Sequence, residues 1–240
     1  MNVNDLQAFY CKQFTIWQNQ HVFKIGTDGM LLGAWVDILD AVDVLEIGTG
    51  TGIISMMMAQ RNKEISIKAI DVSVQAVALA YYNVQKSPFH KQIEVCNYRC
   101  QDFPRNMQFD LLVSNPPYFI ESTKSETVVK NNAKHTDLLS HQELAESVVD
   151  LLKTNGRFSV VLPFVEGNNF IYICESLGMN LLKKTVVHTK KSKPASRLLL
   201  TFQKTFQQII PVEDKLYIQK EEKDRTYTDK YVELTKAFYL

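Results

Sequence analysis

Two short motifs in the chain carry residue types that could do chemistry. The first is the run Glu46-Ile47-Gly48-Thr49-Gly50-Thr51-Gly52, which joins a β-branched segment to an apolar helical one. Glycines allow a tight turn and let the backbone approach a ligand closely, and the start of the following helix offers free N–H groups. The run therefore predicts a nucleotide-like binding site at a strand-to-helix turn.

The glycine spacing and the acid narrow the range of ligands that this run could bind. The dinucleotide fingerprint has the form GxGxxG, whereas this run reads GxGxG. A carboxylate from Glu46 at the end of the strand disfavours a pyrophosphate and favours a ligand that carries positive charge. S-adenosyl-L-methionine has an ammonium and a sulfonium group, so it is the cofactor that the run indicates. The alternative is that Gly48, Gly50 and Gly52 form a plain turn.

Two further acids complete the predicted cofactor site. Asp71 ends the second predicted strand, where a carboxylate can accept hydrogen bonds from both ribose hydroxyls. After the third predicted strand, Asp102 can accept a hydrogen bond from an adenine amino group, and Phe103 can contact the ring. The alternatives are that Asp71 caps the next helix and that Asp102 is a solvated loop acid.

The second motif, Asn115-Pro116-Pro117-Tyr118, follows the fourth predicted strand. Prolines donate no hydrogen bond and stiffen the loop, so the carbonyls there can only accept. The Asn115 side-chain oxygen and the Pro116 carbonyl would accept both hydrogens of a planar amino group and orient its nitrogen toward a methyl donor. Tyr118 would stack on the ring that bears the amine. The motif predicts methylation of a conjugated amine without a metal.

An alternation of short strands and helices positions both motifs. Five β-branched runs predict buried parallel strands: Val42–Ile47, Ile65–Ile70, Ile93–Asn97, Phe109–Ser114 and Phe158–Leu162. Apolar residues at helical spacing predict helices between them: Gly52–Arg61, Val74–Gln85 and Gln142–Leu152. We therefore expect an α/β fold with a mostly parallel, seven-stranded sheet and helices on both faces.

Both ends of the chain add to this sheet. A helix near Asn168–Ser176 and two strand-like runs, Leu181–Thr189 and Arg197–Phe202, predict an antiparallel hairpin toward the C-terminus. Ahead of the sheet, Phe14–Gln18 and Val22–Ile25 predict a small hairpin, and an apolar helix beginning at Thr27-Asp28-Gly29 follows.

No repeat or linker interrupts the chain, so a single domain over residues 1–240 is predicted. It divides into an N-terminal cap or lid over 1–40, a catalytic core over 41–204 and a C-terminal extension over 205–240. Four cysteines outside any CxxC spacing, no secretory signal and no apolar stretch near 20 residues favour a cytoplasmic protein without a membrane partner. The oligomeric state is left open, with a monomer favoured.

Charge is balanced over the whole chain but not along it. The 27 basic and 26 acidic residues give a net charge of +1. Between Ser176 and Val212, however, the sequence has basic residues and no acid: Lys183, Lys184, Lys190, Lys191, Lys193, Arg197 and Lys204. Such a stretch is suited to phosphates, and Lys130, Lys134 and His135 form a second small cluster after the proline motif. The alternative for the later stretch is a solvated hairpin face.

The two motifs together resemble class I methyltransferases that act on exocyclic or amide nitrogens. Within that group the chain is similar to the bacterial tRNA1(Val) (adenine-37-N6)-methyltransferase family. The similarity rests on these segments: Phe14-Thr15-Ile16, the KIGTDGMLLGAW stretch from Lys24 to Trp35, Ala133-Lys134-His135 before Leu139-Ser140, and the ending Tyr227-Thr228 to Phe238-Tyr239-Leu240. It spans essentially the whole chain.

The resemblance implies a Rossmann-like class I fold and S-adenosylmethionine-dependent methylation of adenine N6 in the anticodon stem-loop of a valine tRNA. It also implies site residues. Cofactor contacts would come from Lys24, Thr27, Asp28, Glu46, Gly48, Gly50, Gly52, Asp71, Asp102, Phe103 and Asn115, with Lys24–Asp28 acting as a lid. Asn115, Pro116, Pro117 and Tyr118 would hold the target base, and Lys130, Lys134, His135, Lys190, Lys191, Lys193 and Arg197 would contact RNA.

One position departs from the family pattern, and two other functions stay open. Lys134 stands where the family usually has arginine, which keeps the charge but loses a planar fork for phosphate. The proline motif also occurs in protein glutamine-N5 methyltransferases that act on release factors. Those enzymes usually carry a separate helical N-terminal domain, for which forty residues leave no room. The third possibility is an RNA-binding module without catalytic activity.

Overall fold

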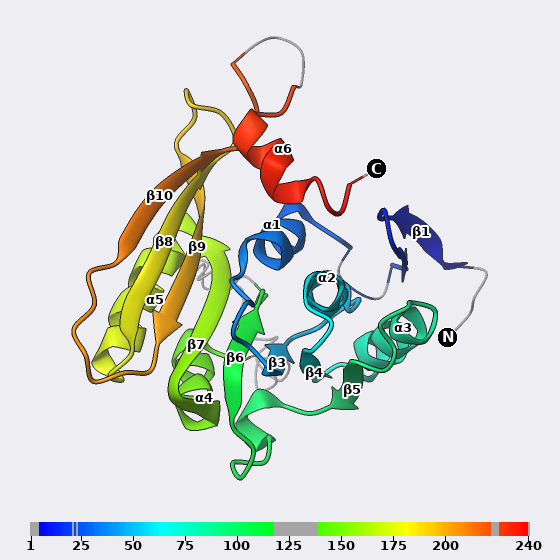
Figure 1. The fold of residues 1–240 in the computed structure, drawn as a ribbon, viewed down its shortest axis with the longest axis horizontal. Helices are drawn as coiled ribbons and strands as arrows, with labels where there is room; N and C mark the ends of the chain where they lie inside the picture. The colour runs from blue at the N-terminus through cyan, green and yellow to red at the C-terminus, as the bar shows by residue number, and fades with distance from the viewer. Residues whose placement is uncertain (1–4, 21, 23, 118–138, 222–225, 240) are drawn as a thin grey trace, which may run out of the picture.

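The computed structural model describes residues 5–20, 22, 24–117, 139–221 and 226–239 (Figure 1). Within these residues the main sheet has eight strands in the order β10-β8-β9-β7-β6-β3-β4-β5. The strands are β3 (Asp43–Ile47), β4 (Ser66–Asp71), β5 (Ile93–Asn97), β6 (Phe109–Ser114), β7 (Leu152–Pro163), β8 (Asn180–His188), β9 (Ala195–Gln203) and β10 (Val212–Tyr217). Neighbouring strands from β5 to β7 are parallel, and β9 is antiparallel to both β7 and β8. The predicted mostly parallel sheet with a late antiparallel hairpin is confirmed.

The eighth strand, β10, adds to the seven that the sequence predicts. It pairs in parallel with β8 at the edge of the sheet, with Val212 opposite Lys183 and Tyr217 opposite His188. The segment reads VEDKLY, and most of its side chains are exposed or half-buried. A charged edge strand lacks the apolar run that marks a buried strand, so the sequence pattern gave no signal for it.

Helices cover both faces of the sheet (Figure 1). The helices are α1 (Thr27–Trp35), α2 (Ile53–Arg61), α3 (Val74–Gln85), α4 (His141–Leu151), α5 (Phe164–Ser176) and α6 (Asp229–Thr235). One core cluster joins α1 and α2 to side chains such as Val44, and another joins α4 and α5 to side chains such as Leu45. Because successive strand residues point to opposite faces, β3 serves both clusters, and Glu46 lies on the same face as Val44.

The N-terminal hairpin differs from its prediction. Strand β2 (Thr15–Gln18) falls within the expected segment, but its partner is β1 (Gln7–Tyr10), which precedes it. The prediction of a second strand over Val22–Ile25 is wrong for the described residues there, which lie outside any strand. The Ile25 amide donates instead to the Gln18 side chain, which guides the backbone toward helix α1.

Both ends of the chain pack against the α1 and α2 side of the sheet. Asn83 of α3 is fully buried, and its amide pairs with both backbone groups of Trp17 in β2 at 2.8 Å. After α6, the Phe238 carbonyl accepts from the Lys12 amide at 3.0 Å, and the Ala237 carbonyl accepts from Gln60 of α2 at 2.8 Å. These bonds hold the N-terminal hairpin and the segment after α6 on one side of the sheet. Among the helices described, none is long and apolar enough to span a bilayer.

Candidate active site at the carboxyl edge of the sheet

The two sequence motifs leave adjacent strands at the same level of the sheet. Ile47 ends β3 and lies opposite Ser114, which ends β6. The Ser114 hydroxyl donates to the Ile47 carbonyl at 2.9 Å, and Ser114 is almost completely buried. In open α/β sheets, ligands bind in the crevice outside the carboxyl ends of the strands. The glycine run and the proline motif therefore lie side by side where such a crevice is expected.

Backbone amides of the glycine loop (Gly48–Gly52) point toward the end of strand β4. Gly48, Gly50 and Gly52 all have positive φ angles, of 76°, 56° and 84°, which other residues adopt only with strain. The Gly48 and Thr49 amides donate to the Ile70 carbonyl at 2.9 and 3.0 Å, and the Gly50 amide donates to Asp71 at 2.9 Å. Amides that are already paired cannot also donate to a phosphate. This agrees with the prediction that the loop does not bind a dinucleotide.

Glu46 is buried beneath this loop with only part of its carboxylate satisfied. It is 1% exposed, and its Oε2 accepts from the Thr49 hydroxyl at 2.8 Å and from the Ser55 amide at 3.1 Å, as well as from the Ser55 hydroxyl. Its Oε1 is buried without a hydrogen-bond partner. Burial raises the pKa of Glu46 from 4.5 to about 7, against the lowering effect of these hydrogen bonds. Such an orphaned oxygen has its acceptor capacity available for a donor from a ligand.

Asp71 ends β4, as predicted, and holds the backbone at two places. Its Oδ2 accepts from the Gly50 amide and its Oδ1 accepts from the Ser73 amide, both at 2.9 Å. Ser73 is the N-cap of α3, so Asp71 forms the turn that leads into this helix. Each carboxylate oxygen can accept more than one bond. The turn-forming role and the predicted ribose contact are therefore compatible.

Asp102 and Phe103 differ in exposure. Asp102 lies in the short 3-10 helix Cys100–Asp102, is exposed, and has its carboxylate 3.8 Å from the Arg99 guanidinium. Phe103 is 3% exposed and packs between Tyr98 and Phe109 in the core. Little of the Phe103 side chain is therefore open to a ligand, and its contact with the adenine ring stays a prediction.

Asn115 lies next to the first turn of helix α1. It is half-buried, Pro116 is buried and Pro117 is exposed. A Cβ placed on Gly29 would lie 3.8 Å from the Asn115 Nδ2 and 3.6 Å from Ile53. A Cβ at position 29 would therefore be in ordinary van der Waals contact with Asn115, so the first turn of α1 lies directly beside the asparagine. Tyr118, the last residue of the motif, lies outside the described residues.

The predicted lid segment is tied to a different part of the sheet. Lys24 and Thr27 are exposed, and Thr27 begins α1. Asp28 forms an ion pair with Arg197 of β9, with its Oδ2 2.9 Å from the arginine Nε. Asp28 was expected to bind the cofactor and Arg197 to bind RNA. In the structure the two charges form one half-buried pair, and their contacts with the cofactor and with RNA stay predictions.

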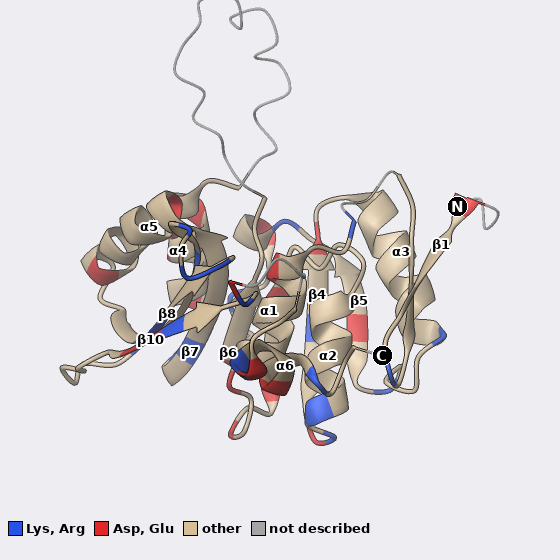
Figure 2. Ribbon diagram, turned by 90° about the horizontal axis from the view of Figure 1, so that it is seen from above, with Lys and Arg blue, Asp and Glu red and all other residues tan. Residues whose placement is uncertain are grey.

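The basic stretch is compensated in space at several positions. The Lys183 ammonium lies 4.7 Å from the Trp35 ring centre, and Lys184 lies 3.9 Å from Glu213. Lys204 donates to two main-chain carbonyls at the end of α4 and the start of β7. Basic and acidic segments are interspersed along the ribbon (Figure 2). The stretch has no acid of its own in sequence, but the fold brings Glu213 to Lys184 and Asp28 to Arg197, so not all seven charges are uncompensated.

Lys190, Lys191 and Lys193 lie in the loop between β8 and β9, which we call the lysine loop (Lys190–Lys193). Its backbone is held by Glu221, which accepts from the Ser192 amide at 2.6 Å and from the Ser192 hydroxyl at 2.8 Å. Lys191 and Lys193 are exposed. The lysine loop is therefore the part of the basic stretch that can reach a phosphate. The other predicted cluster, formed by Lys130, Lys134 and His135, lies outside the described residues.

Sequence reasoning missed the residues that hold the site in shape. Ser55 and Thr49 bind Glu46, and the Asn83 amide donates to the Thr51 carbonyl at 2.9 Å. Thr49 follows Glu46 by three positions within the motif and could have been proposed from that spacing. Ser55 and Asn83 are ordinary polar residues on apolar helices, so no local pattern distinguishes them.

Comparisons with known proteins agree with this geometry. The family model of the methyltransferase small domain matches residues 25–191. A protein from Agrobacterium tumefaciens described as a predicted O-methyltransferase has the same fold, with a TM-score of 0.71 over 88% of this chain and 96% of its own, at 17% identity. Fold and site together therefore define a methyltransferase.

Two curated relatives are more specific. The tRNA1(Val) (adenine(37)-N6)-methyltransferase of Phocaeicola vulgatus is 41% identical over 232 residues, and the protein of the same name from Bacteroides fragilis strain YCH46 is 39% identical over 238 residues. Each alignment covers 97% of both chains. The chain belongs to the tRNA1(Val) (adenine(37)-N6)-methyltransferase family.

Proposed function

We propose that this protein transfers a methyl group from S-adenosyl-L-methionine to the exocyclic N6 of an adenine in tRNA, at position 37 of a valine tRNA. The observation that carries the proposal is the juxtaposition of Asn115 with the glycine loop, through the register of Ile47 and Ser114. The names of the family members supply the nucleic acid, the base and the position. The fold, the acids and the proline motif support the reaction type.

The residues present fit S-adenosyl-L-methionine better than a phosphate ligand. The unpartnered Oε1 of Glu46 would accept from the ammonium group, and Asp71 keeps acceptor capacity for the ribose hydroxyls. A Cβ at Gly48 or Gly50 would meet no atom within 4 Å, so the loop backbone faces open space there. When bound, the cofactor supplies a methyl group on a positive sulfur.

Asn115 and Pro116 would then prepare the acceptor nitrogen. Their carbonyl oxygens accept the two amino hydrogens, which orients the nitrogen lone pair toward the methyl group. As the new N–C bond forms, the C–S bond breaks and its electron pair goes to sulfur. The methylated nitrogen then loses one proton to water. The chain therefore has to position and polarise the amine, and no nucleophilic side chain is required.

The charge of the lysine loop and the organisation of the chain support tRNA as the substrate. A base in a single-stranded loop is extruded at lower cost than a paired one, and the lysine loop can hold nearby phosphates. We propose that residues 1–240 form one methyltransferase domain and that the protein acts in the cytoplasm. Strand β2 of the cap bonds to Asn83 of α3, which also donates to Thr51 in the glycine loop, and the C-terminal extension bonds to Gln60 of α2.

Incubation with labelled S-adenosyl-L-methionine tests this proposal against its alternatives. We expect label in bulk tRNA that lacks the modification, and none in a release factor. Label in the release factor would indicate a protein glutamine-N5 methyltransferase. Label in neither substrate would indicate an RNA-binding module without catalytic activity.

A further inference from the structure

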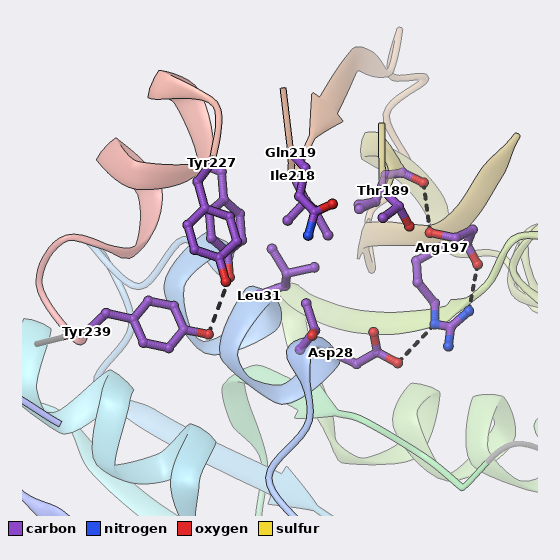
Figure 3. A pocket seen from close by; sticks show the side chains of 12 residues that line it. Asp28, Leu31, Thr189, Arg197, Ile218, Gln219, Tyr227 and Tyr239 are labelled. Atoms are coloured by element: carbon purple, nitrogen blue, oxygen red, sulfur yellow. Dashed lines mark hydrogen bonds and ion pairs between the residues drawn. The ribbon is translucent and has the colours of Figure 1, made fainter. Parts of the chain in front are cut away.

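A pocket opens at the carboxyl edge of the sheet, between α1, α6 and the ends of β8 and β10 (Figure 3). Its volume is about 320 Å³, at the small end of the range for ligand sites. Tyr227 and Tyr239 lie on one side of the pocket and Thr189 and Arg197 on the other, with Leu31 between (Figure 3). Tyr231, whose ring lies against that of Tyr227, also lines the pocket. The pocket is large enough for one nucleobase and too small for a folded RNA element.

The three tyrosines form a stacked series. The Tyr227 and Tyr231 ring centres are 4.9 Å apart with a 32° angle between planes, and the Tyr231 and Tyr239 centres are 6.4 Å apart. The Tyr231 hydroxyl donates to the Tyr239 hydroxyl at 3.3 Å, and Tyr231 is 3% exposed. Burial raises the pKa of Tyr231, so its hydroxyl stays protonated. Tyr227 is 50% exposed and offers its ring to a ligand.

The facing wall is polar but balanced in charge. Arg197 donates from Nε to Asp28 at 2.9 Å and from one terminal nitrogen to the Ser196 carbonyl at 2.8 Å. The ion pair fixes both side chains, and its two charges offset one another. An aromatic face opposite fixed polar atoms suits an uncharged planar ring with hydrogen-bonding edges. It suits a free anion poorly, because the Asp28 carboxylate would repel it.

The pocket adjoins both parts of the site that handle RNA in the proposed function. Thr27, Asp28 and Leu31 line it, while the adjacent Gly29 lies beside Asn115. One turn of α1 thus separates the pocket from the proposed target-base site. On its other side, Thr189 directly precedes the lysine loop. Aromatic rings next to basic side chains are the common means of binding single-stranded nucleic acid.

We infer that this pocket binds the base of a nucleotide that adjoins the target adenosine in the tRNA loop, by stacking on Tyr227. The inference rests on the proposed function and deepens it, because it assigns a second base site to the same substrate. Holding a neighbouring base fixes the strand on both sides of α1, which favours extrusion of the target into the Asn115 site. The lysine loop would hold the phosphates that follow.

The test combines a protein change with an RNA change. Synthetic anticodon stem-loops carry an abasic residue on one side or the other of the target adenosine. For the wild type, we expect one abasic position to raise KM by about tenfold, within the range for stacking one base on an aromatic ring. Tyr227→Ala should raise KM for intact RNA by a similar factor. The same abasic position should then cause no further loss in this variant.

Several controls separate stacking from folding. Tyr227→Phe keeps the ring and should behave as wild type, and Tyr227→Leu keeps an apolar contact to Tyr231 and should behave as Tyr227→Ala. Tyr172→Ala removes an exposed tyrosine of α5 outside the pocket and should leave KM unchanged. Cofactor Kd and Tm are measured for every variant, and we expect the Kd to stay within about twofold.

Losses that multiply between Tyr227→Ala and the abasic RNA, or wild-type activity that ignores both abasic positions, would overturn the second base site while leaving the proposed function intact. A wild-type protein that methylates no RNA at all would overturn both.

Discussion

The two halves of the sheet edge differ in how they are built. At β3 and β4, the glycine loop and its acids come from two adjacent strands, and the loop amides are satisfied by Ile70 and Asp71 at the end of β4. At β8 to β10, the tyrosine pocket joins α1, β9 and α6, with Arg197 and Asp28 paired across 169 positions. The first half is an acidic, preformed loop where we propose that the cofactor binds, and the second is an aromatic pocket beside the lysine loop where we propose that RNA binds. On this proposal the cofactor residues lie close together in the sequence, whereas the RNA residues are brought together by the fold.

The largest expected effect comes from Asn115, which lies between the two halves. Asn115→Ala removes an acceptor that orients the amine, so we expect kcat to fall by about 10³-fold, as for the loss of one well-placed hydrogen-bonding group. Cofactor Kd, measured by calorimetry, should change by less than about threefold. A parallel loss of cofactor binding would show that Asn115 acts mainly in holding the cofactor. The two halves of the sheet edge would then not be separate in function.

Glu46 tests the cofactor half alone. Glu46→Gln keeps the size and the acceptor for Thr49 and Ser55 but removes the charge, so the cofactor Kd should rise by about tenfold or more. For the wild type, the Kd should fall as pH rises from 5.5 to 7.5, because Glu46, with its pKa raised to about 7, becomes ionised in that window. The variant should show no such trend. A Kd for RNA that changes with this substitution would contradict the separation of the two halves.

The lysine loop tests the RNA half alone. Replacing Lys190, Lys191 and Lys193 together by glutamine should raise KM for tRNA by about tenfold at low salt and reduce the slope of log KM against log salt, because fewer counterions are released. The kcat at saturating tRNA and the cofactor Kd should stay the same. Two exposed lysines outside the loop, Lys215 of β10 and Lys230 of α6, serve as controls. Replacing both by glutamine should leave the slope of log KM against log salt unchanged.

A further effect concerns the stability of the protein without ligand. Burial raises the pKa of Glu46 above its value in an unfolded chain, so its contribution to stability is fully present below about pH 4.5 and is lost as pH rises through about 7. Relative to Glu46→Gln, the wild type should lose roughly 3 kcal/mol of unfolding free energy between pH 4.5 and 8. Urea unfolding of both proteins across this range measures the difference. A difference in unfolding free energy that does not change with pH would contradict a buried Glu46 carboxyl with a raised pKa.

The sequence predicted the parts that local patterns encode. Strands β3 to β7, helices α1 to α5 and both motifs followed from apolar periodicity and glycine or proline placement. Strand β10 and the pairing of β1 with β2 were missed, because their partners are set by packing rather than by their own composition. The pairing of Arg197 with Asp28 and the burial of Phe103 were missed for the same reason. Charge counted along the chain could not show which acids the fold brings to each lysine.

The central claim is that the acidic half and the proline motif act together to methylate adenine N6 in tRNA. Its most direct test is mass spectrometry of nucleosides from unmodified tRNA after incubation with S-adenosyl-L-methionine and either wild type or Asn115→Ala. We predict N6-methyladenosine with the wild type at one position beside the anticodon, and none with the variant. A methyl group on another atom or nucleotide, or equal product from the variant, would contradict the account.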